Sequence, residues 1–522
     1  MAREKLILCF DGTGNEPADS EADKRLFGIL GTEDNSVSNI CKLHLLFGGD
    51  LKSGQAIEGQ QSFYYSGVGT YGGTLRRVFN TALAPDNKDV GRIVRAAVKD
   101  LAKWEQNNPD SEYELFIFGF SRGAAIARRF ASVFHDFSEI KRSPKIRFIG
   151  VFDTVAAIGK PNLDDDTKPV SDVLFENGSL SLRVEEALHL LSLDERRVAF
   201  QPTLMNKDQR VTEVWFPGVH SDIGGGFRFD ALSDVTLQFM LDEIKRRDLG
   251  LQVRDPINIP YKKINSQCDN CDLDLDDLII QPNPLGKIHP KKRPPVATRI
   301  TLADRTPRIN VDDQPSTDEN DLPLIHIAAI ERVHEDRDYR PKSLRGSHKV
   351  LYTYGAPNLD HVVSWGSLGE HLMVGDRPAK PLEVDTTQAT KVYANRKYNR
   401  SGVLLEKDAT YLFSVPKGQV WYDASIACDE KGWDRDSQAL GLKELFIKLS
   451  EGKRRLPDAK WFELIGAVDS IEDNLFRVIE YTEGGSTFSP KTEGELHFFA
   501  NDLDRMYGNN RGFITVNVTR IA

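Results

Sequence analysis

Short apolar runs alternate with longer amphipathic stretches over the first half of the chain. The apolar runs are rich in Ile, Val and Phe, as strands buried on both faces usually are. They predict strands at residues 5–10, 114–120, 146–152 and 211–216. The stretches 89–106 and 122–134 have the length and spacing of helices. This alternation predicts an α/β domain in which helices cover both faces of a mostly parallel sheet.

The pattern changes twice in the second half of the chain. Prolines interrupt any periodicity at about 250–323, which predicts an irregular insertion or lid. A helix near 322–333 and an extended piece near 350–354 are expected to return to the first domain, so that this domain spans residues 1–380. Residues 385–522 then predict a compact antiparallel β-sandwich. Its expected strands lie at 410–415, 420–426, 461–468, 475–481, 495–500 and 512–521.

Composition and charge exclude several classes of protein. With 522 residues, 40% of them hydrophobic, the chain is long enough for at least two domains with buried cores. The net charge is −10 and no Lys/Arg run is long enough to bind phosphates in series, which argues against nucleic acid as the main partner. The apolar run at 6–10 is too short for an export signal or a membrane span, so we expect synthesis in the cytoplasm without a cleavable signal.

The cysteines and one acidic stretch do not point to a disulfide-rich or metal-binding protein. Five cysteines in so long a chain do not make a disulfide framework, which fits folding in a reducing compartment. Cys268 and Cys271 form a C-x-x-C pair, but no second pair follows at metal-binding spacing and only His289 is near, which argues against zinc. The acidic stretch 272–277 lacks the glycine and glutamate of a calcium-binding EF-hand loop and is better explained as a solvated turn.

A serine lies between a predicted strand and a predicted helix. Gly119, Ser121 and Gly123 form the G-x-S-x-G pattern at the point where residues 114–120 give way to the helix. A sharp strand-to-helix turn strains the backbone of the central residue, and the flanking glycines remove side chains that would collide there. The pattern therefore predicts Ser121 as a nucleophile, the alternative being a glycine-flanked serine in an ordinary turn.

A serine nucleophile needs a histidine to accept its proton and a carboxylate to orient that histidine. Asp153 follows the strand at 146–152 and His220 follows the strand at 211–216, where a parallel sheet delivers functional groups. Asp153 could instead cap the turn at Thr154, and His220 could be a histidine satisfied within its glycine-rich loop. Asp222 is a rival acid, and the other histidines considered are His135, His189 and His326.

The oxyanion that forms on the substrate needs hydrogen-bond donors. The backbone N–H of Arg122, at the start of the predicted helix, is one candidate. A glycine-rich loop after the first strand, with Asp11, Gly12 and Thr13, offers the second. That loop could alternatively be a tight turn in which Asp11 bonds its own backbone. Phosphatases that form an aspartyl-phosphate use D-x-D-G-T at this place, but Cys9 occupies the position of their nucleophile.

These motifs together resemble a known family. The segments that carry the resemblance are residues 10–15, 119–124, 151–155, 193–197 and 217–226. They resemble the α/β-hydrolase domain of type VI secretion phospholipase effectors with a GxSxG serine, over roughly residues 5–350. The resemblance implies a Ser–Asp–His esterase acting on phospholipid, with Ser121, Asp153 and His220 as the triad. It also implies delivery by a contractile secretion apparatus to a target-cell envelope, and an immunity protein as a partner.

The end of the chain carries a second resemblance. Hard oxygen donors gather at Asp502, Asn509 and Asn510, in a loop that could alternatively be an ordinary hairpin. The segment 390–522 resembles small calcium-dependent galactose-binding lectins of the LecA type. The resemblance implies a Ca²⁺ site with these three side chains and the backbone oxygen of Met506, and a glycan as ligand. Residues 421–433 offer no clear counterpart of the family's sugar-contacting histidine.

Three hypotheses follow from the sequence. The first is a serine phospholipase or lipase that needs no cofactor for catalysis and carries a lectin-like domain. The second is a glycan-binding protein whose hydrolase half is only a scaffold. The third is an esterase that acts on carbohydrate esters or other small esters. Ester turnover and its loss in Ser121→Ala separate the first and third from the second.

Overall fold

The structure is a computed structural model of the full chain. It describes residues 3–12, 36–52, 56–66, 87–142, 144–156, 179–227, 231–268, 271–289, 302–336, 338–352, 371–375, 379–438, 444–469, 474–482, 486–504 and 506–522. The chain divides into two compact units. Unit 1 comprises Met1–Val350 and Ser364–Leu372, and unit 2 comprises Leu351–Val363 and Met373–Ala522.

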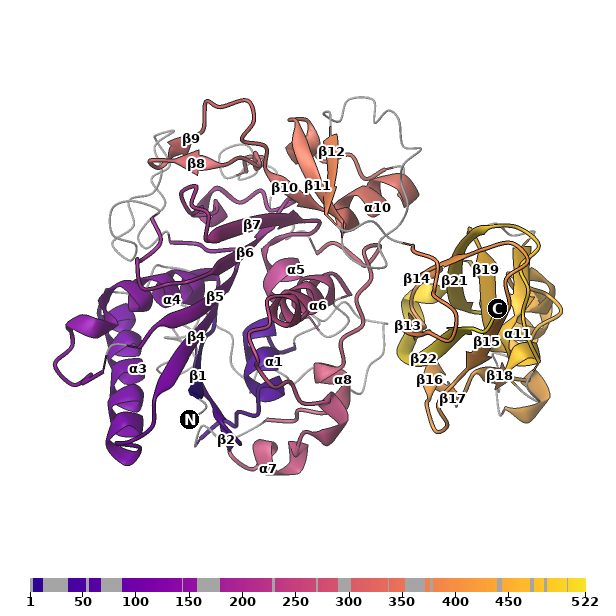
Figure 1. The fold of residues 1–522 in the computed structure, drawn as a ribbon, viewed down its shortest axis with the longest axis horizontal. Helices are drawn as coiled ribbons and strands as arrows, with labels where there is room; N and C mark the ends of the chain where they lie inside the picture. The colour runs from indigo at the N-terminus through magenta and orange to yellow at the C-terminus, as the bar shows by residue number, and fades with distance from the viewer. Residues whose placement is uncertain are drawn as a thin grey trace. The chain divides into compact units, whose positions relative to one another are not determined.

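Unit 1 contains eight strands of a ten-stranded sheet with the order β12-β11-β10-β7-β6-β5-β4-β1-β3-β2 (Figure 1), whereas β11 and β12 each run from residues of unit 1 into residues of unit 2. The strands are β1 (Glu4–Phe10), β2 (Ala56–Ile57), β3 (Gln60–Tyr65), β4 (Tyr113–Phe120), β5 (Ile146–Phe152), β6 (Ala187–Ser192), β7 (Val211–Phe216), β10 (Leu324–His326), β11 (His348–Tyr352) and β12 (His371–Gly375). From β3 across to β10 each neighbouring pair is parallel, whereas β2 pairs with β3 antiparallel. The predicted mostly parallel sheet is confirmed.

Helices cover both faces of this sheet. The helices α3 (Asn87–Asn107) and α4 (Ser121–Val133) lie on one face, and α1 (Asn39–Leu46) and α6 (Ala231–Arg246) lie on the other (Figure 1). Apolar residues of α3 and α4 share a core with the central strands. No helix in the described part of the chain is both long enough and apolar enough to span a bilayer.

The proline-rich stretch is irregular, as expected. Its described part contains only short elements: the 3₁₀ turn η4 (Pro256–Asn258), α7 (Tyr261–Asn265), α8 (Leu275–Leu278), β8 (Asn310–Val311) and β9 (Gln314–Pro315). The helix predicted at 322–333 begins as strand β10, because Leu324 and Ile325 pair with β7, and continues as α10 (Ile327–Glu335).

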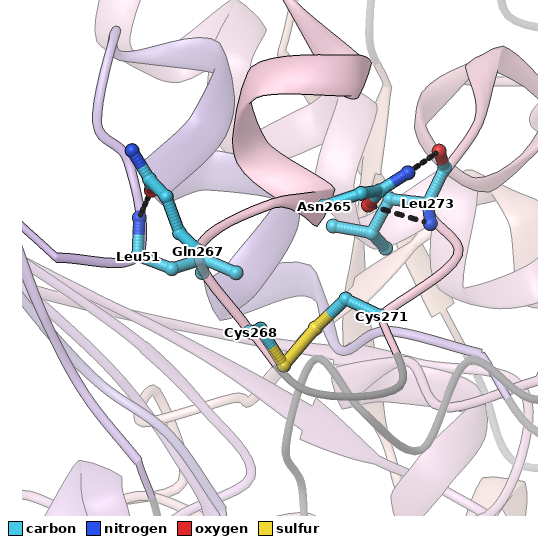
Figure 2. Close-up of a disulfide and its surroundings, with 6 residues drawn as sticks. All are labelled: Leu51, Asn265, Gln267, Cys268, Cys271 and Leu273. Atoms are coloured by element: carbon cyan, nitrogen blue, oxygen red, sulfur yellow. Dashed lines mark hydrogen bonds between the residues drawn. A yellow bond between two sulfur atoms is a disulfide. The ribbon is translucent and has the colours of Figure 1, made fainter.

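A disulfide joins Cys268 to Cys271 between α7 and α8 (Figure 2). Both cysteines are half-buried, and the adjacent chain is fixed by hydrogen bonds from Asn265 to Leu273 and from Leu51 to Gln267. The disulfide was not anticipated from the sequence, where this pair was considered only as a metal site. The remaining cysteines, Cys9, Cys41 and Cys428, are free.

Unit 2 consists of two antiparallel five-stranded sheets around one hydrophobic core. One sheet contains β13 (Thr387–Tyr393), β15 (Tyr411–Ser414), β16 (Trp421–Asp423), β17 (Ile426–Cys428) and β22 (Asn510–Arg520). The other contains β14 (Asn399–Leu405), β18 (Lys431–Trp433), β19 (Trp461–Val468), β20 (Leu475–Arg477) and β21 (Gly494–Ala500). The predicted antiparallel β-structure is therefore confirmed.

Candidate active site

The predicted site residues lie where parallel strands of unit 1 end. Ser121 follows β4, Asp153 follows β5, and His220 opens the short helix α5 (His220–Gly224) soon after β7. Because these strands are parallel and close together in the sheet, their carboxyl ends deliver the three side chains to one edge. All three residues are buried.

Ser121 lies at a strained turn between β4 and α4. Its φ of 56° is in the left-handed region, which confirms the strained backbone expected of the motif. A Cβ on Gly123 would come within 2.3 Å of the carbonyl oxygens of Phe10 and Asp11, and one on Gly119 within 2.7 Å of the start of α4. The flanking glycines therefore allow the turn, as predicted, and Gly123 also allows α4 to approach the end of β1 closely.

His220 bridges the other two side chains. Its Nε2 lies 2.8 Å from Ser121 Oγ, and its Nδ1 lies 2.6 Å from Asp153 Oδ2. An ionised carboxylate only accepts hydrogen bonds, so Nδ1 carries the proton and Nε2 is the nitrogen that accepts from the serine hydroxyl. The arrangement has the connectivity that a base needs to take the serine proton.

Asp153 is held in its ionised form. Burial alone would raise the pKa of its carboxyl, but the charge of Arg305 and the hydrogen bond from His220 outweigh burial, and the pKa lies well below the ordinary value. The backbone N–H of Ser192 adds a hydrogen bond of 3.0 Å to Oδ1. Like Ser121, Asp153 has a positive φ, here 39°. Arg305 was not anticipated from the sequence, because no motif surrounds it.

The imidazole of His220 lies among aromatic rings. Its ring centroid is 4.7 Å from that of Phe120 and 4.9 Å from that of Phe200. Burial lowers the pKa of His220 below its ordinary value, although the hydrogen bond to Asp153 and the charge of that residue act to raise it. The ring is therefore neutral, and able to accept a proton, at neutral pH.

The segment 193–197 supports the loop that carries His220. Asp194 Oδ2 accepts a hydrogen bond of 2.6 Å from the N–H of Gly218, and Glu195 Oε2 accepts one of 3.3 Å from the N–H of His220. Arg197 in turn holds Glu195 through two side-chain bonds. The sequence marks this segment as part of a family motif, but its supporting role becomes evident only from the contacts.

The rival groups have other partners. Asp222 Oδ1 bonds His289 Nδ1 at 2.7 Å, and its Oδ2 accepts the N–H of Val219. His189 lies between Glu213 and the N–H of Thr154, and His326 accepts from the N–H of Ala328 at the start of α10. His135 pairs with Asp136. Of the acids considered, it is Asp153 that bonds the ring of His220.

In the loop after β1, the backbone N–H groups of Asp11 and Gly12 already have acceptors. The N–H of Asp11 donates to Tyr65 O, and the N–H of Gly12 donates to Asp11 Oδ1 at 2.6 Å. This second bond is the local turn of the alternative interpretation. Asp11 Oδ2 also accepts from the hydroxyls of Ser38 and Tyr64, so the carboxylate braces the loop. Thr13 lies outside the described residues, and the second oxyanion donor stays a prediction.

In unit 2 two of the expected calcium ligands, Asp502 and Asn510, contact each other. Asn510 Nδ2 donates to Asp502 Oδ2 at 2.9 Å, and both residues are buried. Asn510 Oδ1 is buried and has no partner among the described residues. Asn509 approaches Asp423 at 3.5 Å, and the carbonyl oxygen of Met506 accepts the N–H of Asn509. These oxygen donors fit the chemistry of Ca²⁺. The described residues contain no group of three or more His, Cys, Asp or Glu side chains that could hold a metal.

The sequence of unit 1 matches a known family over the region that holds this site. Residues 4–143 and 136–243 match the model of the Tle1-like phospholipase effector, catalytic domain, of the type VI secretion system (T6SS). This region is thus similar to a T6SS phospholipase. The Tle1-like region includes Ser121, Asp153 and His220, and it covers less than half of the chain.

Two solved structures are similar to part of the chain. One is an uncharacterized protein from Pseudomonas aeruginosa, with 20% identity, 51% of this chain and 48% of that chain covered, and a TM-score of 0.31. The other is the Tle1 effector bound to the VgrG spike of the type 6 secretion system. Its identity is 26%, the match covers 44% of this chain and 52% of that chain, and the TM-score is 0.29. The similar part spans about half the length of these two proteins. No curated protein sequence matches the chain.

Proposed function

We propose that the chain is a serine hydrolase of the α/β-hydrolase type that cleaves carboxylic esters of lipids, with phospholipids as its substrate class. The observation that carries the proposal is the hydrogen-bonded series Ser121–His220–Asp153 at the carboxyl ends of parallel strands. The substrate class is supported by the match of the Tle1-like region to phospholipase effectors.

In the first half of the reaction, Ser121 Oγ attacks the ester carbonyl carbon as His220 Nε2 takes the hydroxyl proton. The resulting imidazolium is stabilised by Asp153, which stays ionised. When the tetrahedral intermediate collapses, the bond to the alcohol breaks and the alcohol leaves with the proton from His220. Ser121 is then acylated.

In the second half, His220 takes a proton from water as the water oxygen attacks the acyl carbon. The bond to Ser121 Oγ breaks, Oγ recovers the proton from His220, and the free carboxylic acid leaves. In both halves the N–H of Arg122, in the first turn of α4, is available to the oxyanion because the helix offers it no acceptor. The loop at Asp11, Gly12 and Thr13 would supply the second donor after its internal bond opens.

The family match also supports a proposal for the route to the substrate. We propose delivery through a T6SS to the envelope of a target cell, with components of the secretion apparatus and an immunity protein as partners. For unit 2 we propose a Ca²⁺ site at Asp502, Asn509, Asn510 and the carbonyl of Met506, and a glycan ligand. The buried Asn510 Oδ1, which has no partner among the described residues, supports the cation site, although it is Nδ2 of the same amide that faces the Asp502 carboxylate.

The experiment is a comparison of wild type and Ser121→Ala on phospholipid vesicles, short-chain fatty esters and acetylated sugars. We expect the wild type to release fatty acid from phospholipid and the variant to lose at least about 10⁴-fold in kcat, because the nucleophile is gone. Turnover of acetylated sugars alone would favour the small-ester hypothesis. A wild type without turnover of any of these esters would favour the glycan-binding scaffold and refute the enzymatic proposal.

A further inference from the structure

Arg305 reaches the catalytic carboxylate from the irregular insertion. Its Nη1 donates to Asp153 Oδ1 at 2.6 Å and its Nη2 donates to Asp153 Oδ2 at 3.0 Å, a bidentate ion pair whose side chains are both fully buried. The same guanidinium donates to the carbonyl oxygens of Ser192 and Phe200. A planar guanidinium with this many fixed acceptors has little freedom to turn.

The ion pair completes the set of partners around Asp153. Oδ1 accepts from Ser192 N and Arg305, while Oδ2 accepts from His220 and Arg305. Rotation of the carboxylate would break bonds on both oxygens at once. Arg305 therefore fixes the orientation of the Asp153 carboxylate, with Oδ2 directed at His220 Nδ1.

The ion pair also changes the net charge of the groups next to the imidazole of His220. Without Arg305, the charge of protonated His220 would balance the negative charge of the buried Asp153 carboxylate, so the pair would have no net charge. With Arg305 present, Asp153 is already neutralised, so protonation leaves an excess positive charge in a buried site. Two other charges act on His220 directly: Arg197 also lowers its pKa, and Glu195, which accepts from its N–H and pairs with Arg197, raises it. The carboxylates of Asp194 and Asp222 bond the backbone of the same loop.

Resting on the proposed function, we propose that Arg305 is a positioning residue of the triad: it orients Asp153 and holds His220 in its neutral, proton-accepting form. The insertion is thereby part of the active site. The backbone next to Arg305 is anchored to the segment that supports His220, because Leu302 forms a bridge with Arg197 and the N–H of Ala303 donates to Arg196 O at 2.7 Å.

The test is a titration of His220 in the full chain labelled with [¹³Cε1]-histidine, with the His220 signal assigned from His220→Gln. We expect Arg305→Met to raise the pKa of His220 by about one unit, because removal of one neighbouring charge shifts a pKa by this order. The acid limb of kcat/KM on a short-chain ester should move to higher pH by the same amount. Arg247→Met is the control, since Arg247 is half-buried and also paired with two carboxylates, those of Glu186 and Glu243, and should leave both readouts unchanged.

Arg305→Lys separates orientation from charge. Lysine keeps the positive charge but not the two-pronged geometry, so we expect an almost unchanged His220 titration with kcat lower by about tenfold to a hundredfold and KM unchanged. A folded Arg305→Met with the titration of wild type would overturn the inference, as would Arg305→Lys with wild-type kcat. If the wild type hydrolyses no ester, the proposed function fails, and the titration alone still decides whether Arg305 controls His220.

Discussion

At the residue scale, three side chains define the candidate site and two of them have strained backbones. Ser121 and Asp153 both have positive φ, and each directly follows a buried strand. The sequence predicted these residues because a strand, a turn and a helix leave a recognisable pattern around them. It could not predict Arg305, which lies in a proline-rich stretch without periodicity and contacts a carboxylate 152 residues away.

The pH dependence of the wild type follows from His220. The imidazole must be neutral to accept the serine proton, so activity falls as the pH drops through its pKa. Burial lowers that pKa, so we expect the acid limb of kcat/KM to have its midpoint below about 6.5, the ordinary value for histidine. The measurement is kcat/KM from pH 4 to 8 with an ester that does not ionise in this range. A midpoint clearly above that value would contradict the burial of His220 seen here.

At the scale of elements, the long apolar runs were predicted well and the short ones poorly. The strands predicted at 146–152, 211–216 and 461–468 coincide with β5, β7 and β19. The strand predicted at 420–426 is instead two strands, β16 and β17, because the chain reverses near Ala424, whose φ is 50°. The strand predicted at 475–481 ends at Arg477 and continues as a 3₁₀ turn. The order of strands in the sheet depends on contacts between distant segments, which local patterns do not encode.

The approach of α4 to β1 can be tested with a single methyl group. We expect Gly123→Ala to lower the free energy of unfolding by about 1–3 kcal/mol and to reduce activity, because the new Cβ meets the carbonyl oxygens of Phe10 and Asp11. The control is Gly91→Ala in α3, where a Cβ meets nothing within 4 Å and alanine is the better helix former. Urea unfolding of both variants gives the measurement. Equal stability of the two variants would mean that α4 and β1 are not in close contact.

At the scale of the whole molecule, the change of pattern along the sequence predicted two structural regions of different class. Residues 385–522 do lie within one compact unit of antiparallel sheets. The ligand of that unit is a harder problem, because a few oxygen atoms in a loop can serve a hairpin as well as a cation. Asp502 illustrates this problem. Burial raises the pKa of its carboxyl. Its described partners, Asn510 and the N–H of Leu503, are groups that an ordinary hairpin without a cation could also provide.

A Ca²⁺ titration of the full chain by calorimetry decides between these two explanations. We expect one site in unit 2 with a Kd of about 0.1–1 mM, as in extracellular calcium modules, and its loss in Asp502→Ala. Asp504→Ala is the matched control, because Asp504 belongs to the same loop but is exposed and pairs with Lys397. If wild type binds no Ca²⁺, or if both variants bind as wild type does, the proposed site is wrong.

The ion pair between Asp153 and Arg305 also bears on the timing of biosynthesis. Ser121, Asp153 and His220 are synthesised well before Arg305. A nascent chain that contains the first three residues therefore still lacks the arginine that orients Asp153. We expect hydrolytic competence to emerge late, when the insertion docks. Incomplete chains would then have little hydrolytic activity while they are still being synthesised.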